Sequence, residues 1–245
     1  MIDDDMTAHR IIELELIRHT RTAAAPGLCY GHTDVPLADS FPDEAQLVID
    51  RLAARSQSPT EASETVLLSS PLSRCRRLAD CVAASWNGSA PNTAQPIQPE
   101  LDERLQELDF GEWDGRTWSD IDAADRERSR QWMNSCVNTR WPGGESYAEL
   151  AERTVQAMGD AFARLAAHPN TTPTQMLVIA HAGPIRALLA HLLDLPLENS
   201  FRLQVDYGRS SRIRLRWTDP TAAQMDLPRL AFGCSDIQIL SFNQA

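Results

Sequence analysis

The stretch Leu16-Ile17-Arg18-His19 decides the fold, because an arginine and a histidine stand where an apolar run ends. A second stretch of the same form, Leu177-Val178-Ile179-Ala180-His181-Ala182-Gly183, lies far downstream. Both runs predict buried strands, over residues 11–19 and 175–181, that end on an imidazole. In an open α/β sheet the carboxyl ends of the strands form the ligand crevice, so we expect both histidines to face ligand rather than core.

Strand signals alternate with helix signals along the chain. Helical spacing of apolar residues occurs over 42–55 and again after the capping box Ser146-Tyr147-Ala148-Glu149. A short apolar strand at 66–68 leads into Ser70-Pro71, a helix start that places Arg74 in the first turn. This alternation predicts an α/β fold, a three-layer sandwich with a mostly parallel central sheet flanked by helices.

The chain is long enough for one large core, and we expect a single domain over residues 1–245. Apolar and polar residues alternate on both sides of Gly208, which predicts a C-terminal β-hairpin at about 200–217. A last strand is expected around 237–240. An edge of the hairpin could pair across a homodimer, although nothing in the sequence requires it.

The charge balance limits the partners. The chain has 34 acidic and 23 basic residues, a net charge of -11, which argues against nucleic acid or an anionic membrane as partner. No apolar run approaches the length of a membrane helix, and the acidic start is unlike a secretory signal, so we expect a cytoplasmic protein. The five cysteines are odd in number and lack a CxxC pair, which suggests neither a disulfide framework nor a zinc site.

Five residues form the candidate set for chemistry: Arg18, His19, Arg74, Glu107 and His181. Each alone has an ordinary structural explanation. Together, two arginines at strand ends can hold a phosphoryl group through planar guanidinium forks. Like charge would lower the pKa of a neighbouring imidazole and leave a neutral nitrogen free to attack phosphorus. No carboxylate constellation resembles a Mg²⁺ site, so we expect neither a metal nor another cofactor.

Five motifs in order resemble the histidine phosphatase superfamily, whose fold is shared with cofactor-dependent phosphoglycerate mutases. They are Leu16-Ile17-Arg18-His19, Ser69-Ser70-Pro71-Leu72-Ser73-Arg74-Cys75, Leu105-Gln106-Glu107-Leu108-Asp109-Phe110-Gly111-Glu112-Trp113, Pro142-Gly143-Gly144-Glu145-Ser146 and His181-Ala182-Gly183-Pro184-Ile185-Arg186. The segment Cys29-Tyr30-Gly31-His32-Thr33-Asp34-Val35-Pro36-Leu37 is similar to the alpha-ribazole phosphatase branch.

The resemblance implies a role for each residue. His19 would be the nucleophile that becomes a phosphohistidine, and Arg18, Arg74 and His181 would complete the phosphate pocket. Glu107 matches the general acid, which would protonate the leaving alkoxide and then activate water. Spacing alone does not separate it from other nearby carboxylates, namely Asp102, Glu103, Asp109, Glu112 and Asp114. The loop with Tyr30 and Gly31 is expected to bind substrate.

The implied activity is a metal-independent phosphomonoesterase acting on a small phosphate ester. The resemblance favours alpha-ribazole 5′-phosphate or adenosylcobalamin 5′-phosphate, substrates in cobalamin nucleotide-loop assembly. The alternatives are a phosphatase of broad or different specificity, for sugar phosphates or nucleotides, a phosphoglycerate mutase, and a non-catalytic phospho-ligand binding module. The last would be expected to lack His19, Glu107 or Arg74, and this chain has all three.

Two residues depart from the family pattern. Thr20 stands where most of the superfamily has glycine, and His32 stands where the ribazole branch is expected to have arginine. Four of the six tryptophans lie within 113–141, a polar segment that we expect to cover the pocket. Their rings, or Tyr30, could pack against an aromatic leaving group, or the indoles could only anchor the segment to the core.

Overall fold

The computed structural model describes residues 10–56, 64–89, 96–166, 173–217, 234 and 236–245. Its strands are β1 (Arg10–Arg18), β2 (Glu64–Ser69), β3 (Glu100–Leu101), β4 (Thr174–Ala180), β5 (Ser210–Trp217) and β6 (Asp236–Gln244). Its α-helices are α1 (Phe41–Ser56), α2 (Ser73–Ser89), α3 (Trp118–Ala124), α4 (Arg126–Asn134), α5 (Tyr147–Ala166) and α6 (Ala182–Leu192). Three 3₁₀ turns are η1 (Glu103–Leu105), η2 (Gly111–Trp113) and η3 (Leu197–Arg202).

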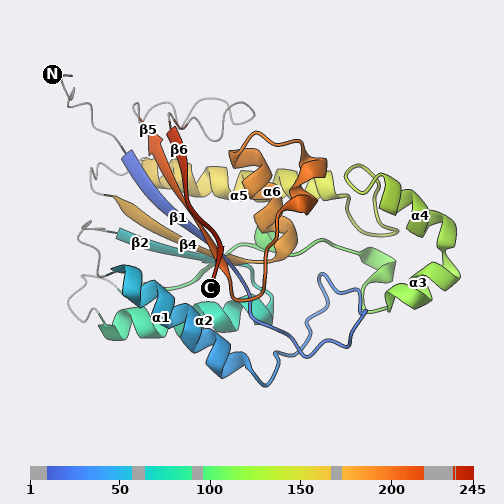
Figure 1. Cartoon of the computed structure of the whole chain (residues 1–245), viewed down its shortest axis with the longest axis horizontal. Helices are drawn as coiled ribbons and strands as arrows, with labels where there is room; N and C mark the ends of the chain where they lie inside the picture. The colour runs from blue at the N-terminus through green and yellow to red at the C-terminus, as the bar shows by residue number, and fades with distance from the viewer. Residues whose placement is uncertain (1–9, 57–63, 90–95, 167–172, 218–233, 235) are drawn as a thin grey trace.

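One sheet forms the middle layer, with strand order β3-β2-β4-β1-β5-β6. The first four strands of this order run parallel, and β5 and β6 continue the sheet as antiparallel strands. Helices α1 and α2 lie on one face and α5 and α6 on the other (Figure 1). The expected α/β sandwich with a mostly parallel sheet is confirmed.

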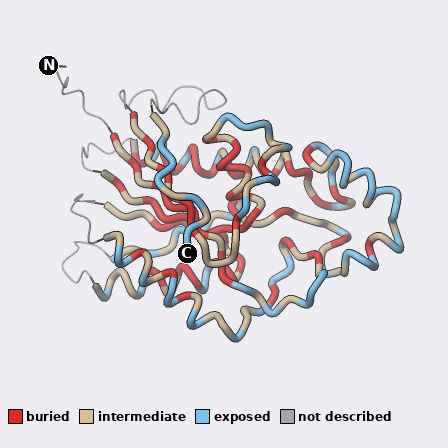
Figure 2. The backbone as a smooth tube through the Cα atoms, in the orientation of Figure 1, coloured by how far each residue is buried: buried red, intermediate tan, exposed pale blue. Residues whose placement is uncertain are grey.

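The central strand β4 is mostly apolar because helices cover both of its faces. In β4, Met176 and Val178 pack toward α5 and α6, while Leu177 and Ile179 pack toward α1 and α2. The buried backbone accordingly follows the inner strands (Figure 2). The polar residues of the two sequence motifs lie at the carboxyl ends of β1 and β4.

The predicted hairpin at 200–217 is wrong. Its second half is β5, but this strand pairs with β1 on one side and β6 on the other. Both edges of β5 are therefore occupied. The first half begins as the 3₁₀ turn η3 and then crosses the strand ends as irregular chain, where the Gly208 N–H donates to the carbonyls of Arg18 and His19.

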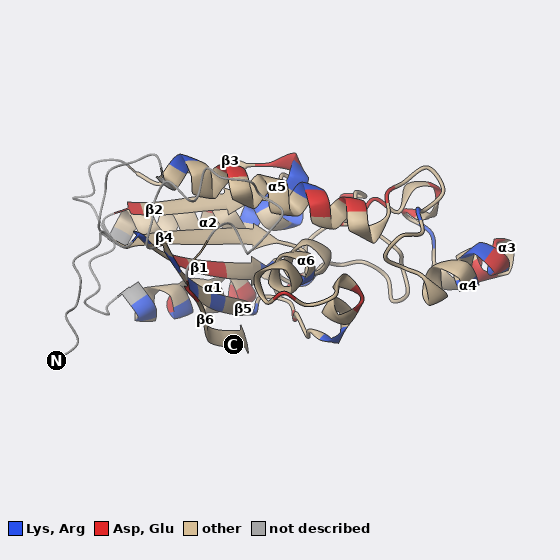
Figure 3. Ribbon diagram, turned by 90° about the horizontal axis from the view of Figure 1, so that it is seen from above, with Lys and Arg blue, Asp and Glu red and all other residues tan. Residues whose placement is uncertain are grey.

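The segment 113–141 contains the short helices α3 and α4, which extend past the carboxyl-end side of the sheet (Figures 1 and 3). α3 carries acidic side chains, and α4 carries both acidic and basic ones. In the part of the chain that is described, no helix has the length and apolar character needed to cross a bilayer.

Candidate active site

The parallel pairing of β1 with β4 brings the two histidines together. Arg18 is in register with Ala180, so His19 and His181 each follow directly after the last residue of adjacent strands. Their ring centroids lie 5.1 Å apart with the edge of one ring toward the face of the other. Both side chains are buried, at 2% and 0% exposure. The sheet thus delivers two imidazoles to one point.

The His19 ring is oriented by a backbone carbonyl. Nδ1 lies 2.7 Å from the carbonyl oxygen of Thr20, which can only accept, so Nδ1 carries the proton of the neutral ring. The lone pair is then on Nε2, the nitrogen available for attack. Because the acceptor is backbone, threonine in place of glycine at position 20 leaves this contact intact. The Thr20 hydroxyl is buried and has no hydrogen-bond partner among the described residues.

Arg74 is fully buried in the first turn of α2 and its guanidinium is held on three sides. Nε donates to His181 Nδ1 at 3.3 Å, Nη1 to the Thr33 carbonyl at 3.1 Å and Nη2 to the Gly31 carbonyl at 2.5 Å. Gly31 is required at this position because a Cβ there would overlap the carbonyl oxygen of Leu108. The backbone carbonyls of the loop at 31–33 therefore fix the orientation of the Arg74 guanidinium. Attraction between charges alone would not fix it.

His181 accepts at Nδ1 from Arg74, so Nε2 carries its proton and donates to Ser70 Oγ at 2.8 Å. Cys75 lies against the same ring, with Sγ 3.4 Å from Nε2. Burial raises the pKa of the Cys75 thiol, which keeps it protonated. His181 is consequently a neutral hydrogen-bond donor in the centre of the site.

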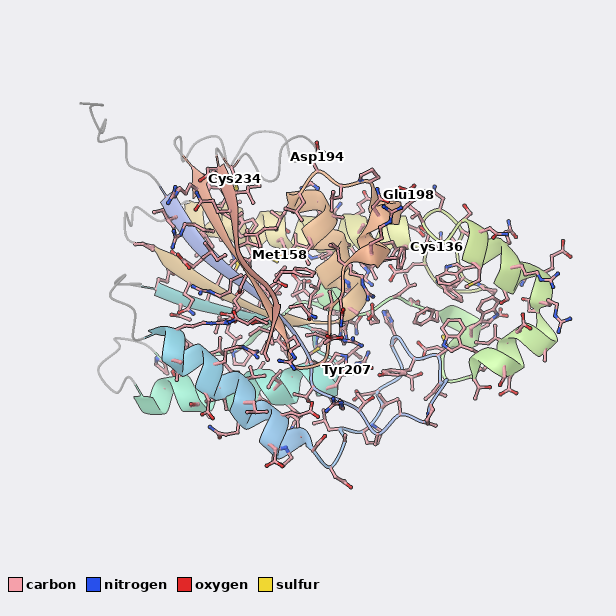
Figure 4. All side chains as sticks on the ribbon, in the orientation of Figure 1. Cys136, Met158, Asp194, Glu198, Tyr207 and Cys234 are labelled. Atoms are coloured by element: carbon pink, nitrogen blue, oxygen red, sulfur yellow. The ribbon has the colours of Figure 1, made fainter. Side chains whose placement is uncertain are left out.

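Tyr207 was not predicted from the sequence as a site residue. Its ring centroid lies 3.7 Å from the Arg18 guanidinium carbon and 5.4 Å from that of the His19 ring. Figure 4 labels Tyr207, which lies in the chain between η3 and β5. Its hydroxyl is 3.1 Å from that of Tyr30, which also meets the Thr22 hydroxyl at 3.0 Å. The guanidinium carbon of Arg74 lies over the Tyr30 ring, 5.3 Å from the ring centroid. Two tyrosines thus border the pair of arginines, and Tyr30 and Gly31 both lie at the site.

The structure distinguishes Glu107 from the other nearby carboxylates. Its Oε1 accepts from the Gly183 N–H at 3.1 Å and from the Leu108 N–H at 3.0 Å. Gly183 is the second residue of α6, two residues after His181, and a Cβ there would overlap Oε1 of Glu107. By contrast, Asp102 pairs with Arg104, and Asp109 accepts from the Gly111 N–H. Glu107 is therefore the carboxylate beside the imidazoles.

Three further residues position the loops around the site. The Asp114 carboxylate accepts the backbone N–H groups of residues 31–33. His32 Nε2 donates to the Glu107 carbonyl at 3.0 Å. Arg153 also donates to that carbonyl, at 3.0 Å. No local pattern predicts these contacts, because they join residues far apart in the chain.

The tryptophans of 113–141 pack on one another. Trp141 is the centre, with Trp132 at 4.5 Å, Phe110 at 4.6 Å and Trp113 at 4.7 Å between ring centroids. Trp113 and Trp141 are each 2% exposed, so they anchor the segment. Trp118 is 39% exposed. The anchoring interpretation accounts for the two buried indoles.

Burial and positive charge both act on the two imidazoles of the site. The His19 pKa lies well below its ordinary value, first because of burial and then because of the charges of Arg18 and Arg74. The His181 pKa is lowered in the same way, by burial and then by His19 and Arg74. Like charge was expected to have this effect, and burial is the larger cause. Both imidazoles are therefore neutral at physiological pH.

These lowered pKa values predict a pH-dependent stability. Unfolded histidine titrates near 6.5, while both buried rings stay neutral to lower pH, so below 6.5 the unfolded chain binds more protons. The stabilisation linked to these two neutral histidines is fully present above pH 6.5 and is lost as the pH falls below that value. For two histidines, the free energy of unfolding should fall by about 2.7 kcal/mol per pH unit once the unfolded rings are protonated.

Urea unfolding of wild type and His19→Gln at a series of pH values between 7.5 and 5 tests this slope. In the variant, the slope of the free energy of unfolding against pH should be smaller by about 1.4 kcal/mol per pH unit. Carboxylates titrate equally in both proteins and cancel in the difference. A difference between the two proteins that does not change with pH would contradict a neutral, buried His19.

Within the described ranges, no group of three or more histidine, cysteine, aspartate or glutamate side chains is arranged to hold a metal ion. The charged groups at the site are guanidinium and carboxylate.

Arg186 lies close enough to Arg18 and Glu107 to interact with both charges, and its Nε donates to the Leu203 carbonyl at 2.9 Å. A third cation thus borders the site.

Comparison with known proteins agrees with this geometry. The family model described as "Histidine phosphatase superfamily (branch 1)" matches residues 14–226. A "Glucosyl-3-phosphoglycerate phosphatase" of Mycolicibacterium vanbaalenii is 30% identical over 196 residues, 78% of each chain. A "Probable phosphoglycerate mutase GpmB" of Salmonella choleraesuis is 28% identical, covering 90% of this chain and 98% of the relative.

Among solved structures, the alpha-ribazole phosphatase of Shigella flexneri superposes with a TM-score of 0.70 at 22% identity, covering 95% of this chain and 96% of that one. The shared fold, the match over most of the chain and the phosphatase relative lead to one assignment. The chain belongs to branch 1 of the histidine phosphatase superfamily and is an enzyme of the phosphoric monoester hydrolase class.

Proposed function

We propose that this enzyme hydrolyses a small phosphate monoester through a phosphohistidine formed on Nε2 of His19. The observation that carries the proposal is the His19 environment: a neutral, buried ring with Nδ1–H fixed on the Thr20 carbonyl. Arg18 and Arg74 flank it and would hold the phosphoryl oxygens opposite this lone pair. A protonated imidazole would have no free lone pair for the attack, and a freely rotating imidazole would not keep Nε2 directed at the phosphoryl group.

The first half-reaction breaks the ester P–O bond. Nε2 of His19 bonds to phosphorus while the leaving oxygen takes a proton from the Glu107 carboxyl group. His181 Nε2–H, on Ser70 Oγ in this structure, is the neutral donor for a phosphoryl oxygen. In the second half-reaction the Glu107 carboxylate removes a proton from water, which attacks phosphorus and releases inorganic phosphate and His19.

Replacement of the Glu107 acid tests this division of labour. With an alkyl phosphate, Glu107→Gln should lower kcat by about 10²–10⁴-fold, because an alkoxide leaves poorly without a proton. With p-nitrophenyl phosphate the leaving group needs no acid, so phosphorylation should persist while hydrolysis stalls. Rapid-quench kinetics should then show a burst of one nitrophenol per enzyme and accumulating phosphohistidine.

Glu103→Gln is the matched control, an exposed carboxylate four residues away in the same segment. It should leave both substrates within about twofold of wild type, as surface substitutions do. If Glu107→Gln slows both substrates equally and no phosphoenzyme accumulates, Glu107 is not the proton carrier of both steps.

The substrate that we propose first is alpha-ribazole 5′-phosphate or adenosylcobalamin 5′-phosphate. Support comes from the Cys29–Leu37 segment, whose Tyr30 and Gly31 lie at the site, and from the fold shared with an alpha-ribazole phosphatase. The second candidate is a glycosylated phosphoglycerate or another sugar phosphate. The 30% identical phosphatase relative favours it, as does Arg186, a third cation that could meet a substrate carboxylate.

A panel of phosphate esters separates these candidates by kcat/KM. Alpha-ribazole 5′-phosphate should exceed ribose 5-phosphate, nucleotides and glucosyl-3-phosphoglycerate by at least tenfold if the riboside is recognised. Preference for glucosyl-3-phosphoglycerate, reduced at least tenfold in Arg186→Gln, would favour the second candidate instead. Interconversion of 2- and 3-phosphoglycerate faster than their hydrolysis would identify a mutase.

A further inference from the structure

Arg153, in the second turn of α5, makes five hydrogen bonds, all of them within the protein. Its Nη1 donates to the carbonyls of Arg104 and Gln106, at 2.7 and 2.8 Å, and its Nη2 donates to the Glu107 carbonyl at 3.0 Å. Nε and Nη2 also donate to the two carboxylate oxygens of Glu145, at 2.9 and 2.5 Å. A guanidinium has five N–H groups, so none remains for a substrate. Arg153 therefore acts on the chain that contains Glu107 and not on the phosphate itself.

Glu145 holds the same chain from its other end. It belongs to the Pro142–Ser146 motif, to which the proposed mechanism gives no role. Its Oε1 accepts from the Asp109 backbone N–H at 3.0 Å, and its own backbone N–H donates to the Asp109 carbonyl at 3.1 Å. The side chains of Arg153 and Glu145 are only 19% and 15% exposed, so water competes little for these bonds. The two residues form a clamp on the backbone of residues 104–109.

The clamped segment carries the proposed general acid. The Glu107 carboxylate is held by backbone N–H groups, one from Leu108 and one from Gly183 of α6. The Glu107 carbonyl is held separately, by Arg153 and by His32, each at 3.0 Å. Proton transfer requires the donor and acceptor atoms to come within hydrogen-bond distance, and a displacement of about 1 Å can cost about 10²-fold in rate. The position of this backbone therefore matters for the reaction.

We propose that Arg153 and Glu145 are positioning residues, which set the distance over which Glu107 transfers its proton. The inference rests on the proposed function of Glu107. The phosphate-binding arginines depend on other contacts, because Arg18 donates to the Val205 carbonyl and Arg74 to the carbonyls of the loop at 31–33. Loss of the clamp should thus weaken proton transfer and leave phosphate binding intact.

Arg153→Lys tests the clamp. Lysine retains the positive charge that helps to lower the His181 pKa, but it lacks the planar fork that reaches three carbonyls and a carboxylate. Single-turnover phosphorylation by an alkyl phosphate should slow by about 10–100-fold, with KM within about twofold of wild type. Phosphorylation by p-nitrophenyl phosphate, whose leaving group needs no acid, should stay within about threefold. A variant that only loosens the pocket would slow both esters and raise KM.

The same substitution in the Glu107→Gln background tests whether Arg153 acts through the acid. A positioning effect requires the group that is positioned, so Arg153→Lys should slow alkyl phosphate there by no more than about twofold further. An equal loss in both backgrounds would overturn the proposal, since Arg153 would then act by a route that does not include Glu107.

Arg164→Lys is the matched control, because Arg164 lies on the same helix, is 57% exposed and pairs with Glu100 at 3.0 Å. It should leave both esters within about twofold of wild type. Glu145→Gln is a second variant, which keeps the shape of the side chain and removes its charge, and it should show the same selective loss. Near-ultraviolet circular dichroism shows whether each variant is folded, and Glu145→Gln decides the question if Arg153→Lys is not.

The two esters also separate this inference from the proposed function. If Glu107→Gln itself slows both esters equally, the role assigned to Glu107 fails and the clamp has no acid to position. If Glu107→Gln slows the alkyl ester selectively while folded Arg153→Lys or Glu145→Gln does not, the proposed function stands and the positioning role is overturned.

Discussion

His19→Ala is expected to lower kcat by about 10⁴-fold or more, because the variant has no atom that can carry the phosphoryl group between the two half-reactions. Incubation of wild type with a reactive phosphate ester should place one phosphate per chain on His19, stable in base and lost in acid, as a phosphorus–nitrogen bond requires. The variant should not be labelled. Quench-flow with mass spectrometry measures both the rate and the label.

His191→Asn is the control for this labelling experiment, since His191 lies in the last turn of α6, ten residues beyond His181. It should retain full labelling. Chelation with EDTA should leave wild-type turnover unchanged, because arginine and imidazole meet the phosphoryl charge in the proposed mechanism. Turnover that persists in His19→Ala, or that is lost with EDTA, would refute a phosphohistidine pathway based on these residues.

Arg74→Ala should have the second largest effect, a decrease in kcat/KM of about 10³-fold. The guanidinium would bind the phosphoryl group in the ground state and more strongly in the transition state, and it also holds the His181 ring and the carbonyls of Gly31 and Thr33. The substitution leaves these groups without a donor. Unfolding free energy should also fall, by about 2–4 kcal/mol.

Arg74→Lys distinguishes charge from geometry. A lysine restores one positive charge but lacks the planar fork, so kcat/KM should recover only part of the loss and remain at least tenfold below wild type. Arg77→Ala, an exposed arginine on the same helix, should change kcat/KM by less than about twofold. Competitive inhibition by inorganic phosphate reports pocket affinity separately from turnover. Full rescue by lysine would mean that the fork is not used.

The local sequence pattern was sufficient to predict those helices and strands whose structure depends on residues that are neighbours along the chain. The capping box at Ser146 and Glu149 forms as expected, and the apolar run 175–180 is a strand because both of its faces are covered. The same runs predicted where polar residues would be left at strand ends. The alternation over 201–207 predicted a strand that does not form. A strand also needs a free edge to pair with, and β1 and β6 occupy both edges of β5.

The sequence by itself determined that His19 and His181 would lie at strand ends and Arg74 in the first turn of a helix after another strand, because apolar runs and helix-start residues are local signals. Only the tertiary structure decided that Tyr207 stacks on Arg18, that Asp114 fixes the loop holding Arg74, and that Glu107 among its neighbouring carboxylates reaches Gly183. Each of these contacts joins segments dozens of residues apart. Their energies depend on where the folded backbone brings the two partners, and no local periodicity records that.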